Sequence, residues 1–375
     1  MSITIDIFMS KKSPHHIAFA GGSTWGHVVP IASLLKYALR KNYRNVHETA
    51  AFFWFGEPDS LEEQECKRLR EDDYQIHFLG IMSGKMRRQP NVMEFLHNIT
   101  DAFKLFWWTL QSMRYLKKYH IDTIFCKWWY VSLPVVFAAK LLWVRIVVHE
   151  SDSTPGLSTR IAAKFASKIF LGFPEVLQGG EYVGQIISHE LINQRLAESP
   201  QVDKPTILVN CGSLGSASVH KALLGLLELD SELLEKFHWT VLLGKLNKNF
   251  RVHYEQYPQI MVYDFADQKL MGKLYCDADI SICRGGSTTL MEQQLFGIHQ
   301  IIIPIPWTHD QFLNGEFFAK TYGHTLIDQT KPFRSAALGD ILLSKTKYRK
   351  QPVQIQDVVQ QVTATKDRIL DSLLT

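Results

Sequence analysis

The stretch ADISICRGGSTTLME, residues 278–292, places an apolar run directly before a Gly-Gly turn and follows the turn with three hydroxyl residues. The run 280–283 predicts a strand buried on both faces, and the hydroxyl residues predict the start of a helix. At the carboxyl edge of a parallel sheet, glycines in such a turn let the first N–H groups of the helix approach a phosphate. Glycine that only closes a tight turn is the alternative, because one such turn is a weak signal.

Two more glycine-rich turns follow apolar runs, in AFAGGSTWGHVVP at 18–30 and in LVNCGSLGSAS at 208–218. In an open α/β sheet, turns at the carboxyl ends of strands line the crevice in which ligands bind. Three turns of this kind therefore favour a nucleotide ligand over the purely structural alternative.

Short apolar runs alternate with segments of helical length along the whole chain, which is the pattern of parallel sheets covered on both faces. A first series lies at 16–20, 50–56, 74–80, 123–128, 143–149 and 168–173, and a second series starts after a polar stretch at 190–205. We therefore predict an α/β protein with two Rossmann-like, doubly wound parallel-sheet domains that face each other across a cleft. The expected domains are 1–188 and 189–354, and a helix at 355–375 is expected to join the first.

The composition, 375 residues with 46% hydrophobic and 21% charged, is that of a globular protein long enough for two domains. The 41 Lys and Arg exceed the 37 Asp and Glu by only four charges, which does not indicate a nucleic-acid partner. Five cysteines without a C-x-x-C pair predict buried thiols in a reducing compartment. The N-terminus lacks the order of a signal peptide, and Lys140 and Arg145 interrupt the longest apolar stretch. We expect a cytoplasmic protein without a transmembrane helix.

Six segments carry residues that resemble the motifs of one family in sequence and in order. They are GGSTWGH at 21–27, HESD at 149–152, VGQIIS at 183–188, CGSLGS at 211–216, CRGGSTTLME at 283–292 and HDQFLNG at 309–315. Over about residues 16–330 the chain resembles the MurG family of bacterial peptidoglycan glycosyltransferases. The resemblance implies the GT-B fold and an inverting transfer of N-acetylglucosamine from UDP-N-acetylglucosamine to the polyprenyl-linked acceptor lipid I, which gives lipid II. It also implies a peripheral enzyme on the inner face of the cell membrane that uses no metal or other cofactor.

The CRGGSTTLME segment carries the main candidates for donor binding. Arg284 follows a strand, where a guanidinium can meet a pyrophosphate, and Ser287, Thr288 and Thr289 offer N–H and hydroxyl donors at a helix start. The resemblance assigns the two ribose hydroxyls of the donor to Glu292. Thr289 and Glu292 also have the spacing of a capping box, in which the glutamate binds only a backbone N–H.

Other donor contacts rest on the resemblance. It assigns a phosphate contact to Ser213, for which an ordinary helix N-cap is the alternative. It assigns the uracil to the backbone of Ala266 and a further donor contact to Gln311. The remaining donor-binding candidates are Ser23, Thr24, Gly26, Asp152 and Ser188.

His27 is the first candidate for the catalytic base, because it stands in a turn on the crevice side and imidazole titrates near neutral pH. It is expected to take the proton of the acceptor hydroxyl. A histidine that only caps or packs the turn is the alternative. Glu150 and Asp152 follow another strand and are the next candidates, as base or as contacts of the donor sugar; they can also simply solvate a loop.

Three positions depart from the family pattern. The first turn has one residue more than the family's GGTGGH, and Trp25 stands in it. Asp152 replaces the asparagine of HEQN, and Ser188 replaces the arginine that closes VGNPVR. Loss of that cation weakens the expected binding of the donor phosphates. The acceptor and the donor sugar of this chain can therefore differ from those of the family.

Asp277 and Asp279 resemble the D-x-D motif that binds a divalent ion in glycosyltransferases of another fold. They precede the strand instead of following it, so we expect them to lie away from the crevice. No His and Cys residues have zinc spacing either.

A long helix is expected over residues 91–119, with a buried stripe of Val92, Phe95, Ile99, Phe103, Phe106, Leu110 and Met113. Leu105 and Trp108 lie off this stripe, and Met86, Arg87 and Arg88 precede the helix. Aromatic beside basic side chains suit an anionic membrane surface, so these five residues are the candidate membrane contacts. A wide face buried under neighbouring helices is the alternative.

Two rival functions remain. The first keeps the fold and changes the lipid acceptor, because the altered turn and the missing arginine lie where specificity is set. The second is a non-catalytic partner that binds a sugar nucleotide, against which the set of His27, Arg284 and Glu292 argues.

Overall fold

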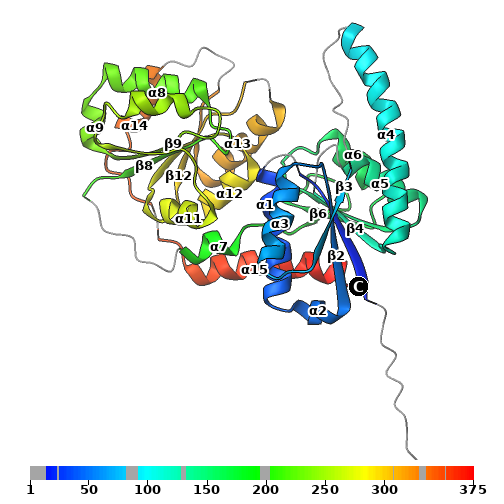
Figure 1. Ribbon diagram of the computed structural model, residues 1–375. Coiled ribbons are helices and arrows are strands. Elements are labelled where there is room, and N and C mark those ends of the chain that lie inside the picture. Colours follow the sequence, from blue (N-terminus) through cyan, green and yellow to red (C-terminus); the bar gives the residue numbers. More distant parts are fainter. Residues whose placement is uncertain are drawn as a thin grey trace, which may run out of the picture.

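The computed structural model describes residues 14–22, 25–81, 92–127, 132–194, 203–306, 308–328, 335–350 and 352–375. It contains two sheets, and every strand pair in the described chain is parallel. Each sheet carries helices on both faces (Figure 1). The predicted fold class, two Rossmann-like α/β units, is confirmed.

The first sheet has the strand order β3-β2-β1-β4-β5-β6-β7. Its strands are β1 (His15–Ala20), β2 (Ala50–Gly56), β3 (Ile76–Gly80), β4 (Thr123–Cys126), β5 (Arg145–Glu150), β6 (Lys168–Leu171) and β7 (Glu181–Tyr182). The helices of this half are α1 (Trp25–Arg40), α2 (Val46–Thr49), α3 (Leu61–Glu71), α4 (Val92–Lys118), α5 (Ser132–Leu141) and α6 (Leu157–Ala163). The order reverses between β1 and β4, which opens a crevice at their carboxyl ends.

The second sheet has the strand order β10-β9-β8-β11-β12-β13. Its strands are β8 (Thr206–Asn210), β9 (His238–Leu242), β10 (Ile260–Tyr263), β11 (Ile280–Cys283), β12 (His299–Ile302) and β13 (Thr325–Leu326). Its helices are α8 (Ala217–Leu229), α9 (Glu232–Lys236), α10 (Arg251–Tyr254), α11 (Gln268–Asp277), α12 (Ser287–Leu295), α13 (His309–Tyr322) and α14 (Ser335–Leu343). The order reverses between β8 and β11, and the two glycine-rich turns of this half follow these strands.

The apolar runs of the sequence become strands that are buried on both faces. In β1, Ile17 and Phe19 pack on one face of the sheet, and Ala18 and Ala20 pack on the other. All four side chains are fully buried. Continuous apolar runs, and not alternating ones, are therefore what this chain needs at its central strands.

Helix α15 (Ile355–Leu373) connects the two halves. It packs against α1 and against α7 (His189–Asn193), and Figure 1 shows it in red beside α7. Ile369, Leu370 and Leu373 belong to the core of the first sheet, and Val358 and Val362 belong to that of the second.

Helix α4 is present as one long helix, but the expected buried stripe is wrong at Phe103 and Phe106, while the side chains of Val92, Phe95 and Ile99 lie outside the described part. Phe103 is 67% exposed and Phe106 is 59% exposed. The buried positions of this part are Thr109, Ser112 and Leu116, because the small polar residues allow α4 to lie close to α5. The stripe is therefore shifted around the helix, and large apolar side chains face outward.

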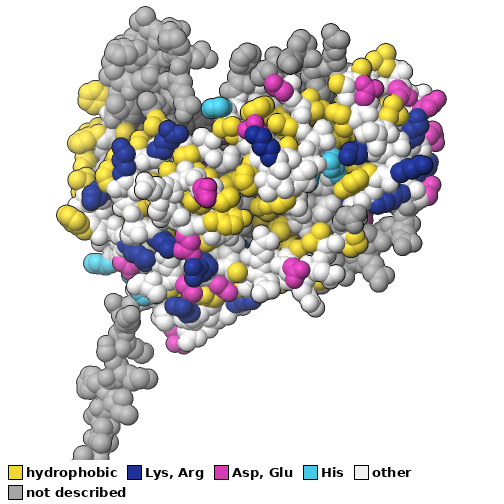
Figure 2. Space-filling view, turned by 180° about the vertical axis from the view of Figure 1, so that it is seen from behind, with side chains coloured by type: hydrophobic (Ala, Val, Ile, Leu, Met, Phe, Trp, Pro, Cys, Tyr) yellow, Lys and Arg dark blue, Asp and Glu magenta, His cyan; other side chains and the backbone are white. Residues whose placement is uncertain are grey.

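Exposed apolar side chains gather on the flank of α4 and α5. They are Phe103, Phe106, Trp107, Leu141 and Trp143. Figure 2 shows this flank with yellow side chains interspersed with Lys and Arg. Leu105 and Trp108 are half-buried, while Met86, Arg87 and Arg88 lie outside the described residues. In the described part of the chain, no helix is long and apolar enough to cross a membrane.

Candidate active site

A cavity of about 500 Å³ lies between the two halves of the molecule. The first half lines it with residues of α1 and α3, and the second half lines it with the turns after β8, β9, β10 and β11. The sequence-predicted residues among its lining are Gly26, Ser188, Ser213, Ala266, Thr288, Thr289 and Glu292. The cavity thus brings together donor-binding candidates that lie up to 266 positions apart, from 26 to 292.

Glu292 lies in the wall of the cavity, inside α12. The N-cap of this helix is Gly286 and Thr289 stands within its first turn, so the expected alternative of a capping box is absent. Glu292 accepts a hydrogen bond of 3.3 Å from the hydroxyl of Tyr275, which in turn accepts one of 3.1 Å from Nδ2 of Asn210. Burial raises the pKa of Glu292 to about 7. A ligand hydroxyl that donates to this carboxyl would offset the cost of its burial.

Ser213 lies in the turn after β8 and is not a helix cap. The N-cap of α8 is Ser216, whose hydroxyl accepts from the N–H of Val219 at 3.4 Å. Gly215 has a φ of 76°, and a Cβ there would lie 1.9 Å from the carbonyl oxygen of Leu243. The glycine is therefore required by a close approach of two turns, and this approach leaves Ser213 facing the cavity.

Arg284 does not line the cavity. Its guanidinium donates to the carbonyl oxygens of Ile303 at 2.8 Å and Pro304 at 3.0 Å, and to the hydroxyls of Ser216 and Ser218. In this structure the side chain fastens the start of α8 to the end of β12. Both terminal nitrogens of the guanidinium have protein acceptors, and the assignment of Arg284 to a pyrophosphate stays a prediction.

His27 lies in the first turn of α1 and is half-buried. Burial, followed by the charge of Lys127, lowers its pKa to about 3. The imidazole is therefore neutral at physiological pH. It is in the form that can accept a proton, although burial and the charge of Lys127 keep its affinity for that proton low.

Lys127 is a buried residue that the sequence analysis missed. It directly follows β4, and Nζ donates to Nδ1 of His149 at 3.3 Å and to the hydroxyl of Ser151. Burial lowers the pKa of Lys127 to about 8, while Glu150 and Asp152 act in the opposite direction. Its position at the carboxyl end of an apolar run, where site residues of parallel sheets gather, was the available signal.

Glu150 is the last residue of β5 and is buried, and Asp152 lies two positions further along the chain and is half-buried. Burial and then the charge of Asp152 raise the pKa of Glu150 to about 7, and Oε1 of Glu150 accepts from the N–H of Asp152 at 2.9 Å. Burial also raises the pKa of Asp152. Asp152 accepts a hydrogen bond of 3.0 Å from Nδ2 of Asn314, and Oδ1 of Asn314 accepts one of 2.8 Å from the N–H of Ser153. Asp152 and the N–H of Ser153 therefore join the first half of the protein to α13 of the second.

The remaining predicted residues lie around this contact. The hydroxyl of Ser287 acts to lower the pKa of Asp152, against the effect of burial. Oε1 of Gln311 accepts from the N–H of Ile305 at 3.2 Å, and a Cβ on Gly285 would lie 2.2 Å from the backbone oxygen of Gln311. Ser23 and Thr24 lie outside the described residues. Within the described ranges, no group of three or more His, Cys, Asp or Glu side chains could hold a metal ion.

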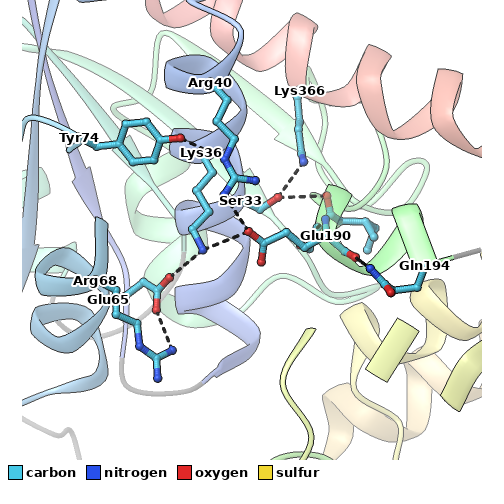
Figure 3. A network of polar contacts seen from close by, with 11 residues as sticks. Ser33, Lys36, Arg40, Glu65, Arg68, Tyr74, Glu190, Gln194 and Lys366 are labelled. Atoms are coloured by element: carbon cyan, nitrogen blue, oxygen red, sulfur yellow. Dashed lines mark hydrogen bonds and ion pairs between the residues drawn. The ribbon is translucent and has the colours of Figure 1, made fainter. Parts of the chain in front are cut away.

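A network of polar contacts borders the cavity on the side of α1 (Figure 3). Lys36 pairs with Glu65 of α3 and with Glu190 of α7, each at 3.5 Å, and Arg40 reaches Glu190 at 3.3 Å. Lys366 of α15 donates to the hydroxyl of Ser33 at 2.7 Å. These contacts fix α7, which begins the connection to the second half, against the first. Ser188 is the N-cap of α7 and accepts from the N–H of Glu190, so it lines the cavity as part of a helix start.

Comparison with known proteins identifies the family. Residues 17–171 match the glycosyltransferase family 28 N-terminal domain, and residues 206–357 match the glycosyltransferase family 28 C-terminal domain. The UDP-N-acetylglucosamine–N-acetylmuramyl-(pentapeptide) pyrophosphoryl-undecaprenol N-acetylglucosamine transferase of Staphylococcus aureus strain JH9 is 32% identical over 84% of this chain and 86% of its own length. The chain belongs to glycosyltransferase family 28. Its counterpart of the same name in S. aureus strain Newman is 33% identical over 81% of this chain and 83% of its own length.

Solved structures agree with this family 28 assignment at the level of the fold. The crystal structure of Acinetobacter baumannii MurG has a TM-score of 0.67 at 20% identity and covers 96% of this chain and 99% of its own. A UDP-GlcNAc 2-epimerase from Neisseria meningitidis, bound to UDP-GlcNAc, has a TM-score of 0.64 at 9% identity, with 96% and 99% covered. The family 28 protein is therefore a hexosyltransferase with the two-domain GT-B fold.

Proposed function

We propose that this family 28 enzyme transfers N-acetylglucosamine from UDP-N-acetylglucosamine, with inversion, to the lipid-linked N-acetylmuramyl-pentapeptide lipid I and so forms lipid II. The observation that carries the proposal is the chain of Asn210, Tyr275 and Glu292 in the wall of a cavity that two glycine-rich turns also line. A buried carboxyl suits a ribose diol, and helix starts suit a diphosphate. The name of the S. aureus relative supplies the donor sugar and the acceptor.

In this proposal the second half of the enzyme holds the donor. Glu292 accepts the ribose hydroxyls, Ser213, Thr288 and Thr289 donate to the diphosphate, and the backbone of Ala266 holds the uracil. Arg284 supports the site by fixing the turn that ends at Ser216. Developing charge on the leaving diphosphate is then stabilised by fixed dipoles and hydroxyls.

His27 is proposed as the base that takes the proton of the acceptor hydroxyl. The diphosphates of the substrates bring negative charge to a site where Lys127 now lowers the proton affinity of His27. Because opposite charge favours the imidazolium, substrate binding would raise the pKa of His27 toward the working range. Glu150, with a pKa of about 7, is the alternative base.

We further propose that the enzyme needs no metal or other cofactor, works in the cytoplasm, and docks on the anionic inner face of the membrane to reach its acceptor. The exposed flank of α4 and α5 supports this docking, since aromatic and basic side chains lie together there. We divide the enzyme into an acceptor domain at 1–188, joined by 355–375, and a donor domain at 189–354. The contacts of α15 with α1 support this division.

The deciding experiment is a panel of sugar nucleotides with lipid I as acceptor, read by the mass of the product. One added N-acetylhexosamine from UDP-N-acetylglucosamine is expected, with activity unchanged by a metal chelator. Donor hydrolysis without transfer to lipid I would favour a different lipid acceptor. Trp25 and Ser188 give that alternative its basis, because both line the cavity where the chain departs from the family pattern. Absence of any turnover, with UDP bound, would indicate a non-catalytic binding partner.

A further inference from the structure

Lys245 follows β9 and reaches the cavity from a turn that is bonded to the turn after β8. Its backbone N–H donates to the carbonyl oxygen of Ser213 at 2.9 Å. A Cβ on Gly244 would lie 2.3 Å from the backbone nitrogen of Gly215, so the two turns approach this closely only because glycine precedes the lysine. The backbone of Lys245 is therefore held directly beside Ser213, the proposed phosphate contact.

The side chain of Lys245 is exposed and lines the cavity. Nζ lies 5.5 Å from the ring centroid of Trp25 in the first half and 5.9 Å from that of Phe265 in the second, and both rings also line the cavity. Asp264, the acid next to Phe265, pairs with Arg251 at 2.8 Å instead. Among the described residues no carboxylate pairs with Lys245. Two rings attract its ammonium to this place, and its three N–H donors can still serve a ligand.

The other cationic side chains of the cavity wall are less suited to a ligand beside Ser213. Lys36 and Arg68 both pair with Glu65, at 3.5 Å and 3.6 Å. Lys269 is the second residue of α11 and follows the turn after β10. Of the cations that line the cavity in the described chain, only Lys245 is hydrogen-bonded through its backbone to the turn after β8.

The two positions at which the sequence leads us to expect positive charge for a phosphate do not bring it to the cavity wall. Arg284 is not part of the lining, and both terminal nitrogens of its guanidinium have protein acceptors. Ser188 stands where the family pattern has an arginine, and it serves as the N-cap of α7. A diphosphate that leaves water needs compensating charge from the protein. The geometry leaves Lys245 as the best placed source.

We infer that the ammonium of Lys245 binds an oxygen of a substrate diphosphate and supplies positive charge in the cavity at which the family pattern has the arginine replaced by Ser188. Trp25 and Phe265 position the ammonium for this contact. The inference rests on the proposed function, since that function supplies diphosphates from two sources. One is the UDP donor and the other is the pyrophosphate of the lipid acceptor.

Binding measurements on Lys245→Met separate these sources, because methionine keeps an unbranched apolar side chain beside the two rings and removes the charge. The affinities for uridine, UMP and UDP are measured by calorimetry without acceptor, and KM for lipid I is measured at saturating donor. If the diphosphate is that of UDP, the variant loses about tenfold in UDP affinity and changes little toward uridine. If it is that of the lipid, UDP affinity stays constant and KM for lipid I rises about tenfold.

Two further measurements identify charge as the cause. Lys245→Arg keeps the positive charge and should retain most of the affinity that Lys245→Met loses. Raising the salt concentration should narrow the difference between the wild type and Lys245→Met, because ions screen a charge at an exposed position. A lysine that only supports the packing of the two rings would show neither effect.

Two other lysines serve as matched controls. Lys221→Met makes the same change on the exposed surface of α8, away from the cavity lining, and should alter none of these values. Lys269→Met makes it at a second lysine of the lining, and UDP affinity should fall by a smaller factor than in Lys245→Met. Thermal denaturation of each variant checks that it is folded.

Several results would overturn the inference. Unchanged UDP affinity together with unchanged KM for lipid I in Lys245→Met removes the contact. An equal loss for uridine and UDP, or a loss as large in Lys245→Arg as in Lys245→Met, would show that the lysine does not act through a diphosphate charge. Equal losses in Lys269→Met and Lys245→Met would replace the specific contact by the general charge of the cavity. Failure of the wild type itself to bind uridine nucleotides would overturn the proposed donor as well, whereas the other results leave it intact.

Discussion

Asn314 and Asp152 are joined by a hydrogen bond of 3.0 Å between the amide nitrogen of one and a carboxylate oxygen of the other, although 162 positions separate them in the chain. Nδ2 of Asn314 also donates to the carbonyl oxygen of Gly285 at 3.1 Å, and its Oδ1 accepts from the N–H of Ser153. One side chain thus holds the loop after β5 against the turn after β11. Glu150 ends β5 directly before the first of these segments, and Arg284 lies in the second.

We predict that Asn314→Ala lowers the free energy of unfolding by about 2 kcal/mol, because it leaves the half-buried carboxylate of Asp152 without the amide donor and the N–H of Ser153 without its acceptor. Asn314→Asp should cost more, since it brings a second negative charge to Asp152. Urea denaturation measures both, and Asn249→Ala at an exposed position is the matched control. Equal stability of Asn314→Ala and the control would show that the contact contributes nothing.

For Glu292→Gln we expect donor affinity to fall about tenfold, because an amide is a weaker acceptor for ribose hydroxyls than a carboxylate. The same substitution should change how the free energy of unfolding depends on pH. The pKa of Glu292 is about 7 in the fold and near its usual value of 4.5 in the unfolded chain, so the folded wild type loses stability as pH rises from 4.5 to 7. The glutamine variant avoids this loss.

The free energy of unfolding of Glu292→Gln, measured relative to that of the wild type, should therefore be up to about 3 kcal/mol higher at pH 8 than at pH 4.5. Denaturation at the two pH values, with exposed Glu228→Gln as control, measures this difference. A constant difference between variant and wild type from pH 4.5 to 8 would contradict the raised pKa.

Replacement of Lys127 by Met should raise the pKa of His27, since it removes the nearby positive charge that adds to the effect of burial. It should also raise the pKa of Glu150, which loses a counter-charge. An NMR titration of the His27 ring reads the first effect directly, with Lys221→Met on the surface of α8 as control. An unchanged pKa of His27 in a folded variant would show that the charge of Lys127 does not influence the histidine.

If His27 is the base, His27→Ala should lower kcat by roughly 10² to 10⁴-fold with donor affinity nearly unchanged, because the proton is transferred only in the transition state. The profile of kcat against pH at saturating donor decides the role. An acid limb with the same midpoint in an active variant would assign the base to another group, with Glu150 first. His253→Ala, at an exposed position, should leave kcat unchanged.

Vesicle binding tests the outward face of α4. The double variant Phe103→Ser with Phe106→Ser should bind anionic vesicles several-fold more weakly, because each substitution removes apolar area that would be buried in the membrane interface. Turnover of a soluble acceptor analogue should be retained. Leu229→Ser, at a leucine that is 79% exposed on the second half, is the control. Undiminished vesicle binding would place the docking surface elsewhere.

The fold and the position of the cleft could be predicted because they depend on local order. An apolar run, a glycine turn and a helix start occupy neighbouring positions, and parallel topology brings all such turns to one edge of each sheet. Thr288 was found in this way, whereas the roles expected of Ser213 and Glu292 came from the family resemblance. The short edge strands β7 and β13 were not, since two-residue strands leave no pattern in a sequence.

Side-chain partners could not be predicted, because they depend on distant segments. Arg284 follows a strand as a phosphate ligand does, yet its donors meet the carbonyl oxygens of Ile303 and Pro304. Helical spacing gave the right helix for α4 and the wrong face, because Thr109 and Ser112 allow a closer approach than the aromatic residues do. Lys127 is charged, and only the fold reveals that it is buried.

The packing of α15 determines when the first sheet can complete its core during synthesis. Ile369, Leu370 and Leu373 complete the core of the first sheet, but a ribosome adds them only after the whole second half. At about 5 to 20 residues per second, the first sheet waits about 10 to 40 s for its final helix after residue 188 has been made. A nascent chain therefore exposes the apolar surface that α15 will cover while the second half is synthesised. Proteolytic loss of α15 would lower the stability of the first half, which lies far from it in sequence.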